Sequence, residues 1–499
     1  MLSAPTRRAR AALTAAALAA AAASARPLFS AVAGETAPAS AHVARGGTKE
    51  IELGRRSAQE VAQTVGLVDD DTLQQYVQSV GARLAAGSER PNLPWTFRVV
   101  DDPVPNSFAF PGGFVLITRG LVELLNSEAE LAAVLGHQIG HVNAGHPAQQ
   151  VSRGQLAPLG LGLGAALVPQ LARYGDLASP GLGLMYRKYS RDEERQADEL
   201  SFEYMLRQKY DVREMAGVYV VLRVGTRAVG QSPLPTWRST HPYVSDRLER
   251  TRTRLAALKS PLTGALSVDD LVSNRVDYLR QVKGLAYGVN PRRGFFQGSG
   301  FIHPDLHFRL DVPRGWQKRN LGSTVVAVSP GQDAIIQLTL APETDPASAA
   351  RSFLTQRGVE AGRAFTDSIN GEPVAGRYFQ TRTAQGPVQG VVVYVAYEGR
   401  TYQLLAYAPA GRLAQYDKEF RRTAISFSPL VDRQLLSVQP HRIEIEIVEQ
   451  TVSLVQFNTL SPSASPLDDV VRLNQLPSPD AQIPAGELVK RVIEGWVGE

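Results

Sequence analysis

Two histidines four residues apart, His137 and His141, are the side chains of this chain best suited to hold a metal ion. On an α-helix, residues at this spacing lie one above the other on the same face, so both imidazoles can reach one tetrahedral metal ion. In a hydrolytic HExxH zinc site, the residue after the first histidine is a glutamate that takes a proton from the zinc-bound water. Here that residue is Gln138, and an amide can hydrogen-bond to the water but cannot act as a base near neutral pH.

The residues around this pair predict a buried helix. Ser127 is a candidate N-cap with Glu130 at the third helical position, and Gly145 and Pro147 end the helix. Residues 131–142 are almost entirely apolar outside the motif, and a helix of that composition is buried, so the polar side chains within it need partners. A histidine pair can also arise by chance, and core histidines bonded to backbone carbonyls are the alternative to a metal site.

A second capped helix begins about fifty residues later and supplies carboxylates, with Ser190 as N-cap and Glu193 at the third position. Glu194 and Asp198 lie four apart on one face of it. Glu194 can therefore serve as a third metal ligand, while Asp198 can accept the outer N–H of a ligating histidine. A solvated helix held by pairs of opposite charge is the alternative for this segment alone. The metal interpretation is favoured because both helices occur in one chain.

Four segments, in this order, resemble the family of zinc metallopeptidases that contains HtpX, BepA and the CAAX prenyl proteases. They are an asparagine-led Phe-x-x-Pro-Gly-Gly segment, the histidine helix, a Ser-Arg-x-x-Glu-x-x-Ala-Asp helix and a His-Pro pair, found here at 106–114, 136–141, 190–198 and 241–242. The resemblance covers roughly residues 45–255 and implies a mainly helical, zincin-like metallopeptidase domain with a small sheet. It also implies that zinc is bound by His137, His141 and Glu194, with Asp198 and Arg191 next to these ligands.

The same resemblance implies where a peptide substrate binds. The strand expected at 115–118 becomes the sheet edge that holds an extended peptide by strand addition, with Phe110, Gly112, Gly113 and Phe114 as the substrate-binding residues. An ordinary hairpin turned by the two glycines is the alternative for this segment.

His241 and Gln138 are the two catalytic positions that the resemblance implies. It places His241 at the mouth of the site, able to stabilise the transition state or to occupy the open zinc position; a histidine that merely opens a helix is the alternative. Because a positioned acid–base group contributes about a hundred- to ten-thousand-fold in rate, Gln138 puts peptidase activity in question. A natural pseudoprotease, a residual peptidase with another base and an inactivated form of a glutamate-bearing parent all fit.

The predicted function is that of a zinc-dependent metalloendopeptidase-family protein, leaning towards an enzyme on the strength of the resemblance. It would act on, or bind, peptides and unfolded proteins in protein quality control. The rival from a different class is a zinc-holding pseudoprotease that binds envelope or cell-wall clients without cutting them. A structural protein with a vestigial site is the third reading, and ligands that survive while the base is lost favour the first two.

The amino-terminal segment and the composition indicate where the protein acts. Residues 1–33 are expected to be a secretory signal, because three arginines precede an alanine–leucine run at 11–23. The absence of cysteine excludes disulfides, thiolate ligands and a cysteine nucleophile. The net charge is +5, and basic and acidic residues are interspersed along the sequence, without the basic aromatic patch of a nucleic-acid-binding protein. We expect a secreted protein of the bacterial periplasm or the extracellular space, with a flap at 156–171 that makes at most peripheral membrane contact.

The carboxy-terminal half predicts two further domains. After a linker at 256–300, alternating apolar residues and one helix indicate an α+β domain at 301–430, and its stretch at 308–316 resembles PsbP and Mog-type domains. Residues 440–497 resemble a degenerate LysM module of β-α-β order, with a plain β-α-β tail as the alternative. The LysM resemblance adds cell-wall glycan as a partner.

Overall fold

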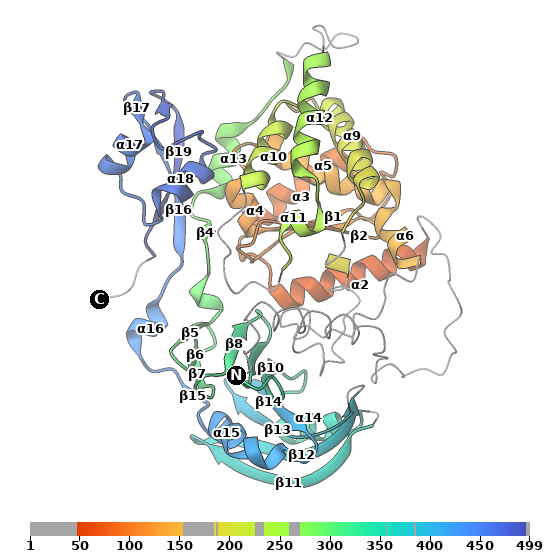
Figure 1. Ribbon diagram of the computed structural model, residues 1–499, viewed down its shortest axis with the longest axis vertical. Coiled ribbons are helices and arrows are strands. Elements are labelled where there is room, and N and C mark those ends of the chain that lie inside the picture. The colour runs from red at the N-terminus through yellow and green to blue at the C-terminus, as the bar shows by residue number, and fades with distance from the viewer. Residues whose placement is uncertain are drawn as a thin grey trace, which may run out of the picture.

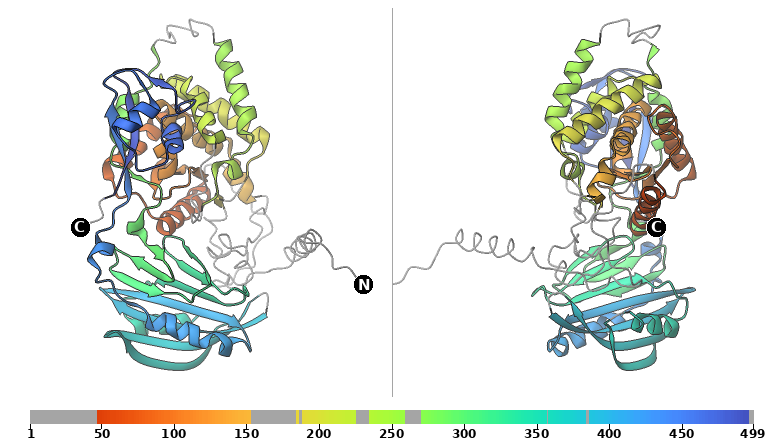
Figure 2. Two further views of the ribbon diagram at one scale, coloured as in Figure 1. Left: turned by 60° about the vertical axis from the view of Figure 1, so that its left-hand side comes forward. Right: turned by 90° about the vertical axis from the view of Figure 1, so that its right-hand side faces the viewer.

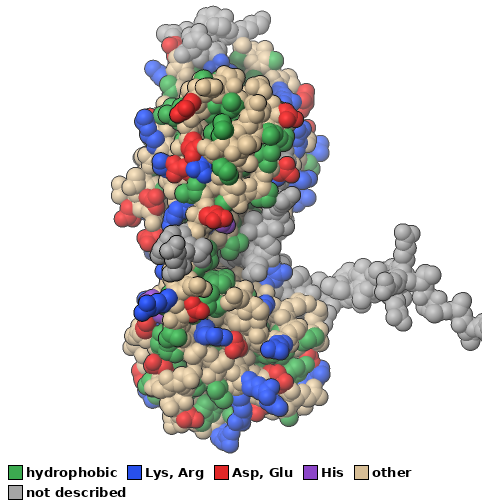
Figure 3. Space-filling model, turned by 90° about the vertical axis from the view of Figure 1, so that its left-hand side faces the viewer, with side chains coloured by type: hydrophobic (Ala, Val, Ile, Leu, Met, Phe, Trp, Pro, Cys, Tyr) green, Lys and Arg blue, Asp and Glu red, His purple; other side chains and the backbone are tan. Residues whose placement is uncertain are grey.

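The computed structural model describes residues 47–152, 184–185, 188–224, 234–258, 270–356, 358–383 and 386–495. The expected signal segment at 1–33 and the expected flap at 156–171 lie outside these residues. The chain forms a helical part, a β-rich middle part and a small carboxy-terminal part that lies beside the helical one (Figures 1 and 2). In these ranges no helix is both long enough and apolar enough to cross a membrane. Positive and negative side chains are interspersed over the face shown in Figure 3.

The helical part is built around one buried helix, α5 (Glu128–Ala144), whose residues from 128 to 142 are all buried. It packs most extensively against α9 (Arg191–Arg207) and also against α3 (Asp71–Ala86) and α10 (Glu214–Val224). The remaining helices of this part are α2 (Thr48–Val65), α4 (Arg119–Leu124), α6 (His146–Ser152), α11 (Trp237–Thr240), α12 (Val244–Ala257) and α13 (Arg275–Val282). The apolar run in the sequence therefore marks the centre of the core, as expected for a helix without a polar face.

A three-stranded sheet lies against these helices, and its strand order corrects one expectation. The strands are β1 (Thr96–Val100), β2 (Ser107–Phe110) and β3 (Phe114–Thr118), in the order β1-β3-β2. The strand expected to be the substrate-binding edge, β3, is thus the central strand, because β1 pairs with it in parallel on the side away from β2. The two edge strands are therefore β1 and β2. The outer N–H groups of Phe97 and Val99 on β1 already donate to the side chains of Gln78 and Gln74, so among the described strands of this sheet β2 is the edge better suited to accept an added peptide strand.

The turn between β2 and β3 explains the Pro-Gly-Gly sequence. Gly112 and Gly113 both have positive φ, 75° and 99°, a conformation that residues with a side chain rarely adopt. Helix α2 covers the turn: the buried carboxylate of Glu50 accepts a hydrogen bond from the Gly112 N–H at 3.1 Å. Phe110 and Phe114 pack in an apolar cluster that includes Val61 of α2. These four expected substrate-binding residues therefore shape and support the hairpin.

Within the segment expected to be a linker, residues 256–300, the described residues 270–300 form helices and strands. Helix α13 buries Tyr278 and Leu279 completely in the core of the helical part, and β4 (Ala286–Tyr287) pairs with a strand of the carboxy-terminal part. The glycines taken as linker residues, at 298 and 300, turn the hairpin of β5 (Phe295–Gln297) and β6 (Gly300–His303). These glycines therefore mark a hairpin and not a linker.

The middle part has α+β architecture, as expected from its alternating residues. Its main sheet has the order β11-β12-β13-β14-β10-β9-β8, with all neighbours antiparallel. A smaller sheet has the order β15-β7-β6-β5. The elements not yet introduced are η3 (Pro291–Arg293), β7 (Phe308–Asp311), β8 (Gln317–Asn320), β9 (Val325–Val328), β10 (Ile335–Leu340), α14 (Pro346–Leu354), β11 (Glu360–Ile369), β12 (Glu372–Thr383), β13 (Gly386–Tyr397), β14 (Arg400–Pro409), α15 (Leu413–Ile425), β15 (Ser428–Pro429) and α16 (Arg433–Ser437).

The carboxy-terminal part returns to the helical part and packs against it (Figure 1). Its two longer strands, β16 (His441–Ile447) and β19 (Leu488–Ile493), are antiparallel and enclose α17 (Leu454–Leu460) and α18 (Leu467–Leu473), with β17 (Val452–Ser453) and β18 (Gln482–Ile483) as a short pair. The expected β-α-β order is therefore wrong by one helix: α17, which begins with a capping box at Ser453, was missed. The fully buried Lys490 donates hydrogen bonds to the carbonyls of Glu123 and Leu125 at 2.6 and 2.7 Å.

Candidate metal centre

Helix α5 presents His137 and His141 to one point, as the four-residue spacing predicts. Its start is fixed by Ser127, whose side chain accepts a hydrogen bond from the Glu130 N–H at 3.1 Å. Its end is fixed by Gly145 in the left-handed conformation. Both histidines are buried, and their Nε2 atoms lie 3.0 Å apart. Two lone pairs can thus converge on one ion.

Helix α9 brings a carboxylate to the same point. It begins with the predicted capping box of Ser190 and Glu193. Glu194 is fully buried, and its Oε1 lies 3.5 Å from the Nε2 of His141. The close approach of the two helices depends on glycines of the histidine motif: a Cβ at Gly140 would lie 2.9 Å from the Ala197 carbonyl oxygen. The glycines within the motif therefore serve the packing that completes the site.

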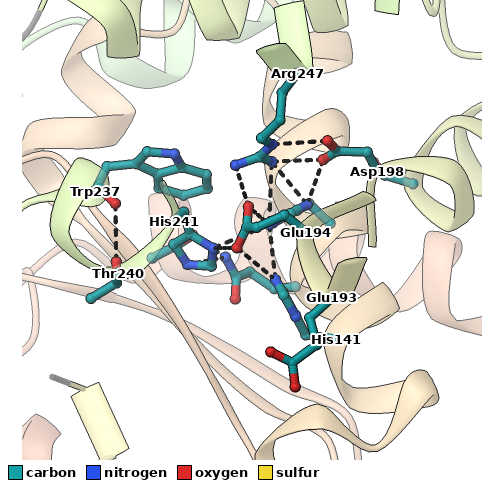
Figure 4. A network of polar contacts seen from close by, with 12 residues as sticks. His141, Glu193, Glu194, Asp198, Trp237, Thr240, His241 and Arg247 are labelled. Atoms are coloured by element: carbon teal, nitrogen blue, oxygen red, sulfur yellow. Dashed lines mark hydrogen bonds and ion pairs between the residues drawn. The ribbon is translucent and has the colours of Figure 1, made fainter. Parts of the chain in front are cut away.

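His241 joins this cluster from the end of α11. Its Nδ1 lies 2.9 Å from Oε1 of Glu194 and 3.2 Å from Nε2 of His137. Its ring stacks on Trp237 with the centroids 4.2 Å apart. Figure 4 shows His241 and His141 on either side of the Glu194 carboxylate. A histidine expected only at the mouth of the site is thus one of four buried residues, His137, His141, Glu194 and His241, whose ligand atoms all lie within 4.8 Å of one another.

The atoms that face away from the cluster also have partners. Nδ1 of His137 lies 2.9 Å from Oδ1 of Asp198, the contact predicted for this aspartate. The guanidinium of Arg247 donates to both oxygens of Asp198 at 2.6 and 2.8 Å and pairs with Glu194 (Figure 4). Arg191, in contrast, is exposed and its guanidinium lies over the ring of Tyr243, 4.7 Å from the centroid. The arginine beside the ligands is therefore Arg247, not Arg191.

Sequence reasoning missed Arg247, although one signal was available. It lies on α12 one residue before Leu248 and three after Val244, and both of these are buried. An arginine within the apolar stripe of a helix needs a carboxylate partner inside the protein. Without the fold, nothing indicated that the partners are Glu194 and Asp198.

The electrostatics of the site set the protonation states. Burial lowers the pKa of His137 to about 4 and lowers the pKa of His141 well below its usual value. Burial alone would raise the pKa of Glu194 and of Asp198, but the Arg247 guanidinium outweighs it and holds both pKa values below their usual range. Near neutral pH the two α5 imidazoles are therefore neutral and both carboxylates are ionised, which are the states that bind a metal ion.

These residues fit a divalent metal ion. The inner nitrogens of His137 and His141 converge, whereas the outer nitrogen of His137 already faces a carboxylate. Histidine nitrogens and a carboxylate oxygen form a donor set that suits zinc. The Oε1 of Gln138 is buried and has no hydrogen-bond partner among the described residues. This oxygen is free to accept a hydrogen bond from a small ligand held at the cluster.

Gln138 connects the cluster to the free sheet edge. Its Nε2 donates to the hydroxyl of Ser107, the first residue of β2, at 2.7 Å, and lies 3.4 Å from Nε2 of His241. The residue in the position of a general base therefore lies between the metal cluster and the strand to which a peptide can add. None of the four expected substrate-binding residues on the hairpin turn makes such a contact in the described part of the chain.

A histidine pair on one buried helix, with a carboxylate from a second helix, defines a metal centre of the kind that metallopeptidases use. The sequence pattern of peptidase family M48 matches residues 71–255, which hold this entire cluster, so this segment of the chain is a domain of that family.

Curated relatives align over the same region. The chain is 30% identical over 222 residues to the beta-barrel assembly-enhancing protease of Yersinia pestis, covering 42% of this chain and 45% of that protein. It is 28% identical over 216 residues to the protein of that name from Escherichia coli, covering 41% and 44%. It is 29% identical over 205 residues to the mitochondrial metalloendopeptidase OMA1 of Arabidopsis thaliana, covering 40% and 39%. The chain thus spans less than half the length of these relatives.

Two solved structures align with about a quarter of the chain at low scores. Cyanobacterial PsbP of Synechocystis aligns with a TM-score of 0.23 and 12% identity, over 27% of this chain and 94% of that one. The Ran-binding protein Mog1p of Saccharomyces cerevisiae gives 0.22 and 12%, over 28% and 99%. Scores at this level carry no argument, so the PsbP and Mog-type resemblance stays a prediction.

Proposed function

We propose that this protein is a zinc-holding metalloendopeptidase-family protein of the bacterial envelope that binds extended segments of protein substrates, and that Gln138 restrains their cleavage. One observation carries the proposal. The ligand cluster is intact, while the side chain between it and the free edge of β2 is an amide whose Oε1 has no partner among the described residues. Relatives named as beta-barrel assembly-enhancing proteases support protein substrates.

Each residue of the cluster has a role in this proposal. His137, His141 and Glu194 would hold the ion, and His241 lies close enough to serve as a fourth ligand. A bound zinc ion lowers the pKa of water and polarises a carbonyl group. Gln138 accepts a hydrogen bond through Oε1 but cannot take up the proton that hydrolysis releases. The site therefore binds and orients a peptide far better than it cleaves one.

The backbone of β2 supports strand addition next to this site. The Thr118 N–H donates to the Asn106 carbonyl at 2.9 Å, so these two residues form a hydrogen-bonded pair. Because hydrogen-bonded and non-bonded pairs alternate in antiparallel sheets, Phe108 also faces β3, and the backbone groups of Ser107 and Ala109 point to the other side. The Ser107 N–H donates to Oδ1 of Asn106 at 2.8 Å, which leaves the C=O of Ser107 and the N–H and C=O of Ala109 for an added strand. An added peptide strand that pairs with Ser107 would pass directly over Gln138.

Replacement of the amide tests the proposal. We expect Gln138→Glu to raise the rate of casein cleavage at least ~100-fold over the parent protein, because a positioned general base contributes at least that much. Cleavage is measured with labelled casein for both forms, with and without a chelator. The matched control is the double variant His137→Ala/Gln138→Glu, which carries the base but lacks a ligand and should stay inactive.

Other outcomes of this assay are equally informative. A parent that already cleaves as fast as Gln138→Glu uses another base, and the restraint by Gln138 is then wrong. A zinc-loaded Gln138→Glu variant that binds casein but does not cut it would show a binding protein of the rival class. Cleavage that a chelator leaves unchanged would contradict a metal-dependent mechanism altogether.

The envelope location rests on the signal-like sequence at 1–33 and on the absence of cysteine. We expect mass spectrometry of the mature chain from a bacterial host to find an amino terminus near Arg26 or Gly34, in the periplasmic or extracellular fraction. Cytosolic protein that retains Met1 would contradict this part of the proposal.

A further inference from the structure

A further buried histidine, His146, contacts the outer nitrogen of a proposed metal ligand. Gly145 ends α5 with φ at 77°, which turns the chain so that the next residue comes back against the helix. His146 is 4% exposed, and its Nδ1 lies 2.9 Å from Nδ1 of His141. Its Nε2 lies 3.2 Å from Oε1 of Gln196 on α9. A chain of contacts thus runs from His141 through His146 to the second ligand helix.

The donor and acceptor roles in this chain follow from the metal side of His141. Its Nε2 faces the cluster, 3.0 Å from Nε2 of His137, so this nitrogen must present a lone pair when a metal ion binds. The ring proton of His141 is then on Nδ1, and Nδ1 of His146 must accept it. His146 consequently carries its own proton on Nε2 and donates it to the amide oxygen of Gln196.

We infer that His146 and Gln196 are positioning residues that hold His141 in the tautomer and ring orientation in which it binds the metal ion. The inference rests on the zinc site proposed above, but it concerns residues outside the ligand set. His137 has the equivalent support from the Asp198 carboxylate. The two ligand histidines of α5 are therefore oriented by different chemistries, one by an ionised acid and the other by a neutral imidazole.

The surroundings of His141 make the contact with His146 decisive for its orientation. Tyr189 stacks on the His141 ring with the centroids 3.7 Å apart and the planes at 22°, so the ring can place its two nitrogens in few directions. His141 is fully buried, and water cannot replace the acceptor at low cost. Without His146, the Nδ1 proton would lose its acceptor, and the other tautomer, which directs a proton at the metal position, would gain population.

Four variants, each also carrying the parent Gln138, test this inference. His146→Leu removes both nitrogens and keeps much of the bulk. His146→Asn keeps an acceptor atom in the position of Nδ1, because the Asn Oδ1 is bonded to Cγ as Nδ1 is. Gln196→Glu keeps an oxygen that can accept a hydrogen bond from Nε2 of His146. It removes the NH₂ group with which the glutamine amide, if turned over, could donate to that nitrogen. Asn143→Ala is the matched control: it is on α5 two residues after His141, but its amide donates to Tyr204 at 2.9 Å.

The first readout is the zinc dissociation constant, measured by competition with a chelator. We expect His146→Leu to weaken zinc binding about 10- to 100-fold, as is typical when the outer partner of a ligating histidine is lost. His146→Asn should recover most of the affinity, and Gln196→Glu and Asn143→Ala should leave it unchanged within about threefold. The second readout is ¹⁵N NMR of the histidine rings in the zinc-loaded parent, where His141 should carry its proton on Nδ1.

The outcomes separate this inference from the zinc proposal. A folded parent without stoichiometric zinc would overturn both. A parent that holds zinc, together with a His146→Leu variant that holds it equally well, would overturn the positioning role alone. Tenfold or greater weakening by Gln196→Glu would show that Nε2 of His146 accepts rather than donates, which also contradicts the inference. If His146→Leu does not fold, as judged by circular dichroism, the comparison of His146→Asn with Gln196→Glu and the NMR assignment still decide it.

Discussion

The helical part and the middle part of this chain bury different kinds of side chain. Among the buried described residues of the middle part, residues 291–430, the only Asp, Glu, Lys, Arg or His is Asp333. In the helical part, the buried described residues of these types are Glu50, Asp102, Arg119, Glu123, Glu128, Glu130, His137, His141, His146, Glu194, Asp211, His241 and Arg247. The two parts have similar apolar cores, so the difference does not arise from a shortage of hydrophobic residues.

This difference shows where the chemistry of the molecule lies. A buried charge costs free energy unless another charge and hydrogen bonds compensate it, and well-packed apolar residues can often replace such a pair without loss of stability. The ion pairs of Arg247 with Glu194 and Asp198 are therefore weakly explained by stability, but they keep both carboxylates ionised and in place beside the histidines. The middle part, with a sheet packed by apolar residues on two faces, shows the composition that stability alone favours.

The largest expected effect is on zinc content, which should depend on residues of the helical part and not on residues of the middle part. We expect the purified parent protein to hold about one zinc ion per chain, and His137→Ala or Glu194→Ala to lose it, because each removes a ligand of a buried site. His303→Ala is the matched control from the middle part, where the imidazole accepts a hydrogen bond from the Leu306 N–H at 3.2 Å. Elemental analysis of folded protein measures all four forms. Zinc that survives both ligand substitutions would place the metal elsewhere.

The elements that local sequence rules govern were predictable. The caps at Ser127 and Ser190, the glycine at the end of α5 and the spacing of His137 and His141 each depend on residues within one or two helical turns. Such patterns can be read without knowledge of the fold. The contact of Asp198 with His137 followed from the same spacing rule applied to the second helix.

The features that sequence reasoning missed depend on contacts between distant segments. The place of β3 at the centre of the sheet depends on β1, which lies before it in the chain and pairs with it in parallel. Arg247 finds its carboxylates about fifty residues back along the chain, and the role of His146 depends on Gln196 of another helix. Helix α13 lies in the segment expected to be a linker, and its contacts with the core of the helical part assign it to that part.

The buried carboxyl groups of the helical part should also make the free energy of unfolding depend on pH. Glu130, in the first turn of α5, is buried beside the carboxy-terminal part, and burial, with a smaller contribution from Glu214, raises its pKa to about 7. Because its usual pKa is 4.5, the folded protein binds the proton more tightly than the unfolded chain, and stability is lost as the pH rises from 4.5 to about 7. We expect Glu130→Gln to remove this loss, about 2 to 3 kcal/mol across the window.

Urea unfolding at several pH values between 4.5 and 7 measures the effect. The buried Lys490 also faces this region, but burial lowers its pKa to about 7 from 10.5, so its contribution falls above the window. Asp333→Asn is the control from the middle part, because the pKa of Asp333 is lowered, despite burial, by hydrogen bonds from Tyr416 and Ser329 and by Arg412. If the free energies of unfolding of the parent and of Glu130→Gln change with pH in parallel, folding does not raise the pKa of Glu130, and this prediction is wrong.

The smallest expected effect tests whether the middle part is governed by packing alone. The hydroxyl of Tyr402 is buried among aromatic rings and has no hydrogen-bond partner among the described residues, whereas the hydroxyl of Tyr397 donates to the His307 carbonyl at 2.9 Å. A buried hydroxyl without a partner costs free energy, and one that is bonded contributes about 1 kcal/mol. We therefore expect Tyr402→Phe to leave stability unchanged or raise it by up to about 1 kcal/mol, and Tyr397→Phe to lower it by about 1 kcal/mol. Both should leave the zinc content of the parent intact, and a loss of zinc in either variant would mean that the middle part is coupled to the metal centre after all.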